Sequence, residues 1–240
     1  MLVLDKISVA FPGKKVLDKC SCTFEAGSIT TILGNNGAGK TTLFKCILGE
    51  VVYSGDATVD DKSICLKDVG YLPQKFEVDA DVNARVIELL VRSLQVKNNA
   101  FFHAKRYIAP ARKLLGEVGI AHLENSMIGN LSGGQAQIVR IALALVNKPK
   151  VLLLDEPLSF LDVPNKLIVM RALKKITCAT NMRTVIISHD LLMAKKMSDC
   201  IFGLRNGCIN VIRKKGARVC ELGICKTLGI NKCAYAEYAS

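Results

Sequence analysis

A buried strand that runs into a glycine-rich loop and then into a helix is the feature that most constrains this chain. Residues 28–33 (SITTIL) are rich in β-branched side chains, which favours a buried strand. The loop that follows consists of Gly34, Asn35, Asn36, Gly37, Ala38, Gly39, Lys40 and Thr41, and a helix pattern continues to residue 49. Glycines let the backbone curl until successive N–H groups face inward, and a helix N-terminus adds its positive dipole end. The segment therefore predicts a phosphate-binding loop at the edge of an α/β sheet.

The side chains at the end of this loop predict a nucleotide with a metal ion. The ammonium of Lys40 is expected on the β- and γ-phosphates, and the hydroxyl of Thr41 is a candidate Mg²⁺ ligand, with Thr42 beside it. A chance glycine turn is the alternative. The order strand, loop, helix argues against it, because a chance turn has no reason to sit in that context.

A second apolar run ends in two carboxylates. Residues 151–154 (VLLL) read as a buried strand, and Asp155 and Glu156 follow directly. Ligands of open α/β sheets bind at the carboxyl ends of the strands. Asp155 is therefore predicted to hold Mg²⁺, and Glu156 to accept a proton from an attacking water. Solvated loop acids are the alternative, which the neighbouring phosphate loop disfavours.

A third segment, which we call the signature segment (residues 131–135, LSGGQ), predicts a second anion site. Ser132 and Gln135 have capping-box spacing, and Gly133 and Gly134 lie between them at the start of an amphipathic helix. Free N–H groups, two glycines and a hydroxyl at a helix N-terminus suit a phosphate. A plain capped helix is the alternative and would be preferred if the segment stood alone.

The rest of the chain alternates short strands with helices, which favours a mostly parallel α/β sheet. Between residues 51 and 72 we expect short strands with turns at Ser54-Gly55 and Asp60-Asp61. Residues of about 80–145 are expected to form an inserted helical lobe. Its first helix would be capped by Asp81, a loop would cover residues 97–105, and Pro110 would lie in the first turn of the next helix. The pair Asn206-Gly207 predicts a hairpin that opens a C-terminal segment over about 206–240.

The charge and hydropathy of the chain limit the classes of molecule that it is expected to bind. The net charge is +12 and the pI is about 9.3, which suits nucleic acid, an anionic membrane surface or nucleotide phosphates. No long basic run carries interleaved aromatics, so we expect a solvated basic surface and no nucleic-acid partner. No run reaches 18 apolar residues, so no bilayer span is predicted. The C-terminal cysteines Cys208, Cys220, Cys225 and Cys233 lack the spacing of a zinc finger, and packing or a metal-sensing tail both stay open.

Together these segments resemble the ATP-binding cassette (ABC) family over nearly the whole chain, because the phosphate loop, LSGGQ and VLLLDEP occur in that family's order. The resemblance implies one P-loop NTPase domain of ABC type over residues 1–240, with an antiparallel β subdomain and the helical lobe. It assigns Gln74 to a nucleotide-sensing loop and to Mg²⁺, and His189 to a catalytic switch. It also places Asp162 near the nucleotide and stacks Phe11 on adenine.

The same resemblance implies partners and a place in the cell. In this family the phosphate loop of one chain and the signature segment of a second copy enclose one ATP, so two chains make two shared sites. A transport cassette of this kind sits on the cytoplasmic face of the inner membrane. It drives integral-membrane permease subunits there, and a solute-binding protein takes part indirectly.

The chain also departs from the family. Two arginines that usually follow the signature segment are replaced by Ile138 and Leu143, with Arg140 nearby. Residues 70–75 and 188–195 look most similar to the ATPase subunits of zinc and manganese importers, zinc first. That reading predicts an ATPase energising uptake of a divalent metal. An importer of another solute, a soluble ABC ATPase of translation or DNA repair, and a cassette without turnover are the alternatives.

Overall fold

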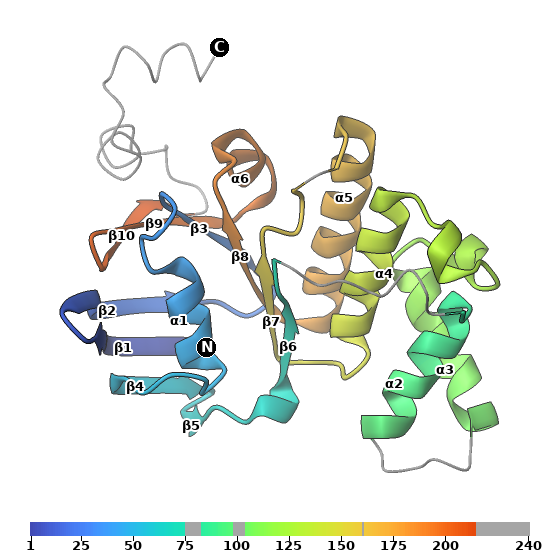
Figure 1. Ribbon diagram of the computed structural model, residues 1–240, viewed down its shortest axis with the longest axis horizontal. Helices are drawn as coiled ribbons and strands as arrows, with labels where there is room; N and C mark the ends of the chain where they lie inside the picture. Colours follow the sequence, from blue (N-terminus) through green and yellow to red (C-terminus); the bar gives the residue numbers. More distant parts are fainter. Residues whose placement is uncertain (75–82, 98–103, 160, 215–240) are drawn as a thin grey trace.

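Two sheets of different kinds frame the molecule in the computed structural model, which describes residues 1–74, 83–97, 104–159 and 161–214 (Figure 1). The larger sheet has the order β10-β9-β3-β8-β7-β6. All its neighbours are parallel except the hairpin of β9 and β10. Its strands are β3 (Ile29–Leu33), β6 (Val69–Leu72), β7 (Val151–Asp155), β8 (Arg183–Ser188), β9 (Cys200–Arg205) and β10 (Cys208–Arg213). The expected mostly parallel α/β sheet is confirmed.

The apolar strands of this sheet are buried on both faces and supply two separate cores. Along β7, Val151 and Leu153 point into one core, and Leu152 and Leu154 into the other. Successive side chains of a strand alternate between faces, so a continuous apolar run is what a doubly covered strand requires. The run VLLL is therefore explained by its position between two layers. The polar residues that follow it, at the end of β7, can contribute to a binding site.

The smaller sheet is antiparallel, with the order β2-β1-β4-β5, and confirms the expected β subdomain. Its strands are β1 (Leu2–Phe11), β2 (Lys14–Phe24), β4 (Ser54–Val59) and β5 (Lys62–Ser63). Helix α1 (Lys40–Ile47) packs its buried face in one core with both sheets. The turn expected at Asp60-Asp61 is confirmed, with φ of 50° and 61°.

The turn expected at Ser54-Gly55 is wrong, because both residues lie within β4. Gly55 has φ of +97°, and a Cβ there would collide with the backbone of Asp5 and Lys6. The register of β1 against β4 shifts between Asp5 and Ser8. The glycine therefore accommodates an irregular stretch of the neighbouring strand and does not end its own.

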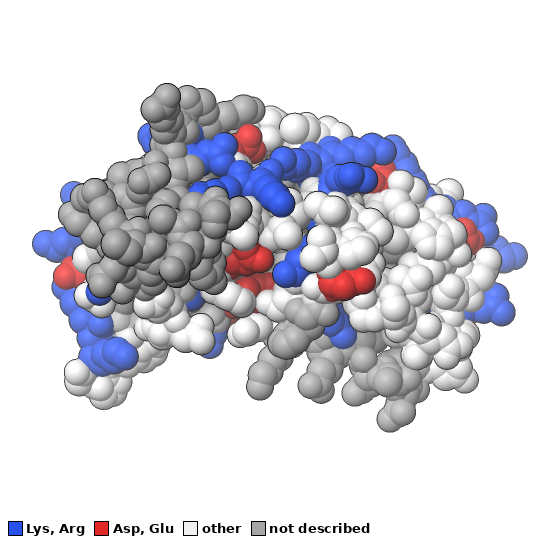
Figure 2. All heavy atoms as spheres, turned by 90° about the horizontal axis from the view of Figure 1, so that it is seen from above, with Lys and Arg blue, Asp and Glu red and all other residues white. Residues whose placement is uncertain are grey.

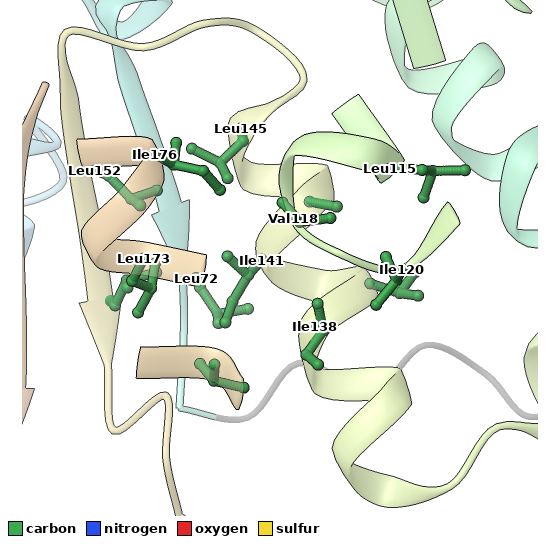
Figure 3. Close-up of a cluster of buried hydrophobic side chains, with 14 of the residues drawn as sticks. Leu72, Leu115, Val118, Ile120, Ile138, Ile141, Leu145, Leu152, Leu173 and Ile176 are labelled. Carbon is green, nitrogen blue, oxygen red and sulfur yellow. The ribbon is translucent and has the colours of Figure 1, made fainter. Parts of the chain in front are cut away.

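In the described part of the chain between β6 and β7, three α-helices form the helical side of the molecule (Figure 1): α2 (Val86–Lys97), α3 (Ala104–Glu117) and α4 (Gly133–Leu145). Short 3₁₀ turns cover Leu66–Asp68, Ala121–Leu123 and Ile128–Asn130. Figure 3 shows Ile138, Ile141 and Leu145 of α4 between side chains of the sheet and side chains of the lobe. Helix α4 thus shares one core with both parts. The expected cap Asp81 and most of the loop at 97–105 lie outside the described residues.

Pro110 does not lie in the first turn of its helix, as the sequence led us to expect, but well inside α3. Proline lacks the N–H that would bond the carbonyl of Arg106, four residues earlier. Both residues are exposed, so water can satisfy that carbonyl. A helical turn that faces solvent therefore tolerates the proline.

Helices α5 (Val163–Thr180) and α6 (Leu191–Met197) complete the fold and carry a basic surface. Between Val163 and Lys214 the only acidic residues are Asp190 and Asp199, whereas Lys and Arg recur throughout. Figure 2 shows many more basic than acidic side chains on the face seen from above. Such a surface attracts anions in general. Among the described helices, none is long and apolar enough to cross a membrane.

Candidate nucleotide site

A cavity of about 450 Å³ opens at the carboxyl ends of β3 and β7. Its lining brings together predicted site residues from three distant parts of the sequence. They are Asn36, Gly37, Gly39, Lys40, Thr41 and Thr42 of the glycine-rich loop, Gln74, and the carboxylates Asp155 and Glu156. Val16 and Ile187 line the cavity too. The cavity thus lies where ligands bind in open α/β sheets.

The backbone of the glycine-rich loop needs its glycines for two reasons. Gly37 and Gly39 have φ of 77° and 102°, where a side chain is strained. Gly34 needs space as well, because a Cβ there would collide with the carbonyl of Leu204 in β9. The loop closes on itself through the N–H of Ala38, which donates to the carbonyl of Asn35 at 3.1 Å. The result is a tight loop packed against the sheet.

Lys40 is held inside the cavity by the loop that precedes it. Its Nζ donates to the carbonyl oxygens of Gly34 at 2.6 Å and Asn35 at 2.9 Å, and only 8% of the residue is exposed. Burial lowers the pKa of Lys40, while the charges of Glu156 and Asp155 oppose that shift. The ammonium is therefore placed at the position where phosphates would meet the loop.

Thr41 and Asp155 connect the loop with the end of β7. The Thr41 hydroxyl donates to Asp155 Oδ2 at 2.9 Å, and Asp155 is 4% exposed. Burial raises the pKa of Asp155, and the hydrogen bond from Thr41 opposes the shift. A hydroxyl and a carboxylate are hard oxygen donors of the kind that Mg²⁺ prefers. Their contact shows that the two donors can reach one ion.

Glu156 is fixed at its backbone and at both carboxylate oxygens. Its φ is +53°, and its N–H donates to the carbonyl of Ile187 in β8 at 3.0 Å. Oε1 lies 2.8 Å from Nδ1 of His189, and Oε2 accepts from the Ser159 hydroxyl at 3.2 Å. A carboxylate held in this way beside the cavity has the position that a general base needs.

The signature segment forms the capped start of α4, outside the lining of the cavity. Ser132 Oγ accepts from the N–H of Gln135 at 3.3 Å, and Gln135 Oε1 accepts from the N–H of Ser132 at 3.0 Å. Gly133 has open space around it, whereas Gly134 packs against Asn165 of α5. Ser132, Gly133, Gly134 and Gln135 are thus a second, separate helix N-terminus.

Three predicted residues beyond the glycine-rich loop also lie outside the lining: Asp162, Phe11 and His189, which still contacts Glu156. Asp162 accepts from the N–H of Asn165 at 3.2 Å and so caps α5. Phe11 ends β1 opposite Lys14 and is 47% exposed. Within one chain, the structure therefore gathers the phosphate loop, Gln74 and the two carboxylates, and leaves the signature segment, Asp162 and Phe11 apart.

Sequence reasoning missed Val16 and Ile187 as lining residues. Gly39 lies close to Val16, because a Cβ on this glycine would come within 3.1 Å of the Val16 carbonyl oxygen and 3.2 Å of its Cγ1. Nothing in the sequence marks the contact, since Val16 is one apolar residue among several in its strand. For Ile187 the position near the end of a buried strand was a usable signal.

Comparison with known proteins agrees with this geometry. A sequence profile of the ABC transporter family matches residues 17–159. The chain is 34% identical over 199 residues to a zinc import ATP-binding protein of Yersinia pestis, covering 83% of this chain and 74% of the relative. It is 36% identical over 202 residues to a zinc import ATP-binding protein of Rickettsia conorii, covering 82% and 80%.

Solved structures give the same fold. An ATP-binding cassette of an ABC transporter in its ADP conformation superposes with a TM-score of 0.80 over 100% of this chain and 99% of that one, at 23% identity. The resemblance to zinc import ATPases expected from residues 70–75 and 188–195 is confirmed. This chain therefore belongs to the ABC transporter family, as an ATP-binding subunit with ATPase activity.

Proposed function

We propose that the chain is the ATP-hydrolysing subunit of an ABC importer that takes up a divalent metal cation, zinc ahead of manganese. The observation that carries the proposal is the 34–36% identity to zinc import ATP-binding proteins over more than four fifths of the chain. The identity extends beyond the site residues, which ABC ATPases of any cargo share. It therefore favours a particular branch of the family.

In this proposal Lys40 and the N–H groups of the glycine-rich loop hold the phosphates of ATP. Glu156 orients the attacking water and accepts its proton, and His189, at 2.8 Å, keeps that carboxylate aimed. Gln74, at the rim of the same cavity, senses the nucleotide. Phe11 is assigned to adenine and Asp162 to the partner-facing side of the nucleotide, by resemblance to the family.

Mg²⁺ is proposed to bind at Thr41, Asp155 and Gln74, whose oxygen donors fit it, and when bound it supplies positive charge to the phosphates. Thr41 and Asp155 keep each other oriented through their hydrogen bond. Burial of Asp155 excludes water from one side of the carboxylate. These residues therefore need little rearrangement to act together.

Two copies of the chain are proposed to share each ATP. A phosphate bound in the cavity of one copy still offers free oxygens. The start of α4, with Ser132, Gly133, Gly134 and Gln135, is the second helix N-terminus suited to an anion. Since these residues lie outside the cavity of their own chain, a second copy is the natural source.

The partners proposed for the dimer are integral-membrane permease subunits at the cytoplasmic face of the inner membrane. A solute-binding protein would act only through the permease. The contact surface is proposed near Gln74 and the helical lobe. Cysteines placed at residues 83–90 should crosslink to co-expressed permease. Crosslinks formed only by cysteines on the sheet face opposite the helical lobe would contradict this placement. Residues 76–82, also expected at this surface, lie outside the described residues.

A growth experiment under metal depletion tests which solute the importer transports. Cells that lack this subunit should fail under zinc chelation and recover with added zinc. Rescue by manganese alone would move the chain to the manganese branch. Normal growth under depletion of both metals, with no second importer present, would contradict a metal cargo and favour another importer or a soluble ABC ATPase.

A further inference from the structure

The signature helix and the loop after β7 are joined by one side chain that the proposed mechanism does not use. Gln137 lies two residues after the signature segment on α4, and its Nε2 donates to the carbonyl oxygen of Pro157 at 2.8 Å. Pro157 directly follows Glu156. The amide therefore connects the helix that Ser132 caps to the residue that follows the proposed base.

Arg140 determines which way this amide points. Its Nη1 donates to Gln137 Oε1 at 3.2 Å. A flipped amide would aim its oxygen at the carbonyl of Pro157 and its NH₂ group at the guanidinium, so both contacts would turn repulsive. Arg140 and the carbonyl of Pro157 therefore allow only one orientation of the Gln137 amide. Arg140, Gln137 and Pro157 thus form a chain of two hydrogen bonds.

Burial of the Arg140 guanidinium is unfavourable at one of its nitrogen atoms. Its Nε is buried and has no hydrogen-bond partner among the residues that the structure describes. A buried donor without a partner is unfavourable and calls for an explanation. Orienting Gln137 supplies one, since the same guanidinium makes the contact that fixes the amide.

The loop that Gln137 reaches is under strain. Glu156 has φ of +53°, in a backbone region that residues other than glycine rarely adopt. On one side its N–H is fastened to Ile187 of β8 at 3.0 Å. On the other side Pro157 is fastened to α4 by Gln137. These two anchors, on the peptides before Glu156 and after Pro157, hold the backbone in a conformation that it would otherwise leave.

We propose that Gln137 is a positioning residue that transmits the position of the signature helix to Glu156, with Arg140 holding its amide in register. The proposal rests on the assignment of Glu156 as the general base. A shift of α4 when the signature segment meets a nucleotide moves Gln137, and Gln137 moves Pro157, the residue beside Glu156. Binding at one helix end and proton transfer at the other site are thereby coupled.

The decisive variant is Gln137→Glu. It keeps the shape and the acceptor for Arg140 but replaces the donor to Pro157 with an oxygen. A displacement of about 1 Å at a reacting group can cost about 100-fold in rate. We expect kcat to fall about 10- to 100-fold while KM for ATP stays within about threefold. Gln137→Met, which has no donor and no charge, should act in the same direction.

Gln95→Glu is the matched control, because it makes the same substitution on α2, away from the loop. It should leave kcat unchanged. Arg140→Met should lower kcat as well, and the double variant Gln137→Glu with Arg140→Met should be no slower than Gln137→Glu alone. Additive losses would show that Arg140 acts by another route.

The same substitution made in the Glu156→Gln variant tests the positioning role of Gln137 independently of the assignment of Glu156 as the general base. In Glu156→Gln chains, Gln137→Glu should change the residual rate by less than about twofold, because the group it positions is gone. A full additional loss there, or wild-type kcat for Gln137→Glu, would overturn the positioning role. Wild-type activity of Glu156→Gln itself would instead contradict the general-base assignment.

Discussion

Nδ1 of His189 lies 2.8 Å from Oε1 of Glu156, and the two side chains differ sharply in exposure, at 71% and 9%. The buried carboxylate is therefore held by a ring that solvent can reach from its other side. An exposed partner can be displaced without opening the core. The contact suits a residue that aims Glu156 and can be moved when a second molecule approaches.

Glu156→Gln should abolish turnover and keep ATP binding. The amide preserves the shape but cannot accept the proton of the attacking water, and a placed general base is worth about 10²–10⁴-fold in rate. Steady-state phosphate release and equilibrium binding of ATP measure the two effects. The variant should also accumulate as an ATP-bound dimer in size-exclusion chromatography. Hydrolysis within a few-fold of wild type would mean that another group is the base.

Mixing two inactive variants should restore activity if each site is shared between chains. In a mixed dimer of Lys40→Ala with Ser132→Arg, one site carries both lesions and the other carries neither. ATPase activity of the mixture should exceed that of either variant alone. Loss of nucleotide binding by Ser132→Arg monomers would instead place the signature segment in the site of its own chain.

Gly134→Ala should destabilise the protein, while Gly133→Ala should not. A Cβ on Gly134 would collide with the side chain of Asn165, whereas nothing lies within 4 Å of a Cβ on Gly133. Overpacking costs about 1–3 kcal/mol, and a compatible Gly→Ala change gains about 0.4–1 kcal/mol. Urea unfolding without nucleotide measures both. Equal stability of the two variants would mean that α4 and α5 separate freely at this contact.

Asp155→Asn should raise the stability of the nucleotide-free protein and remove its ATPase activity. Burial raises the pKa of Asp155 in the folded chain, so folding loses stability as pH rises from the ordinary pKa of about 4 through the raised value. The amide has no such cost, and its oxygen can still accept from Thr41. The gain in Tm should be present at pH 7, shrink as pH falls through the raised pKa of Asp155, and be gone below about pH 4.

Asp56→Asn, at an exposed carboxylate on β4, is the control for this pH profile. It should not reproduce the gain at pH 7. A lower Tm for Asp155→Asn at neutral pH would show that the charge of Asp155 stabilises the folded chain.

The elements that local chemistry dictates could be predicted from the sequence. Asn206-Gly207 forms the expected hairpin turn, with φ of 49° and 75°, because few other residues adopt such angles. The strand, loop and helix around Lys40 follow from glycine geometry and β-branched residues. The fold class followed because these local signals agree with one another.

What depends on neighbours distant in the sequence could not be predicted. The sequence at Ser54-Gly55 predicts a turn, because the irregular stretch of β1 that packs against Gly55 is invisible in the local sequence. The sequence predicts Pro110 in the first turn of its helix, because the solvent exposure that lets α3 contain a proline further along is invisible in the sequence. The position of Val16 in the cavity lining could not be predicted, because only the folded chain brings its strand against Gly39.

The central strand β3 has a consequence for the biogenesis of this protein. It pairs with β8 on one side and β9 on the other, and both strands begin only at Arg183 and Cys200. During synthesis the strand that leads into Lys40 therefore waits with two open edges while most of the chain is made. Such long-range pairing is slow and exposed to misfolding. A nascent chain that stops before residue 183 contains every residue of the phosphate loop but lacks both strands that pair with β3.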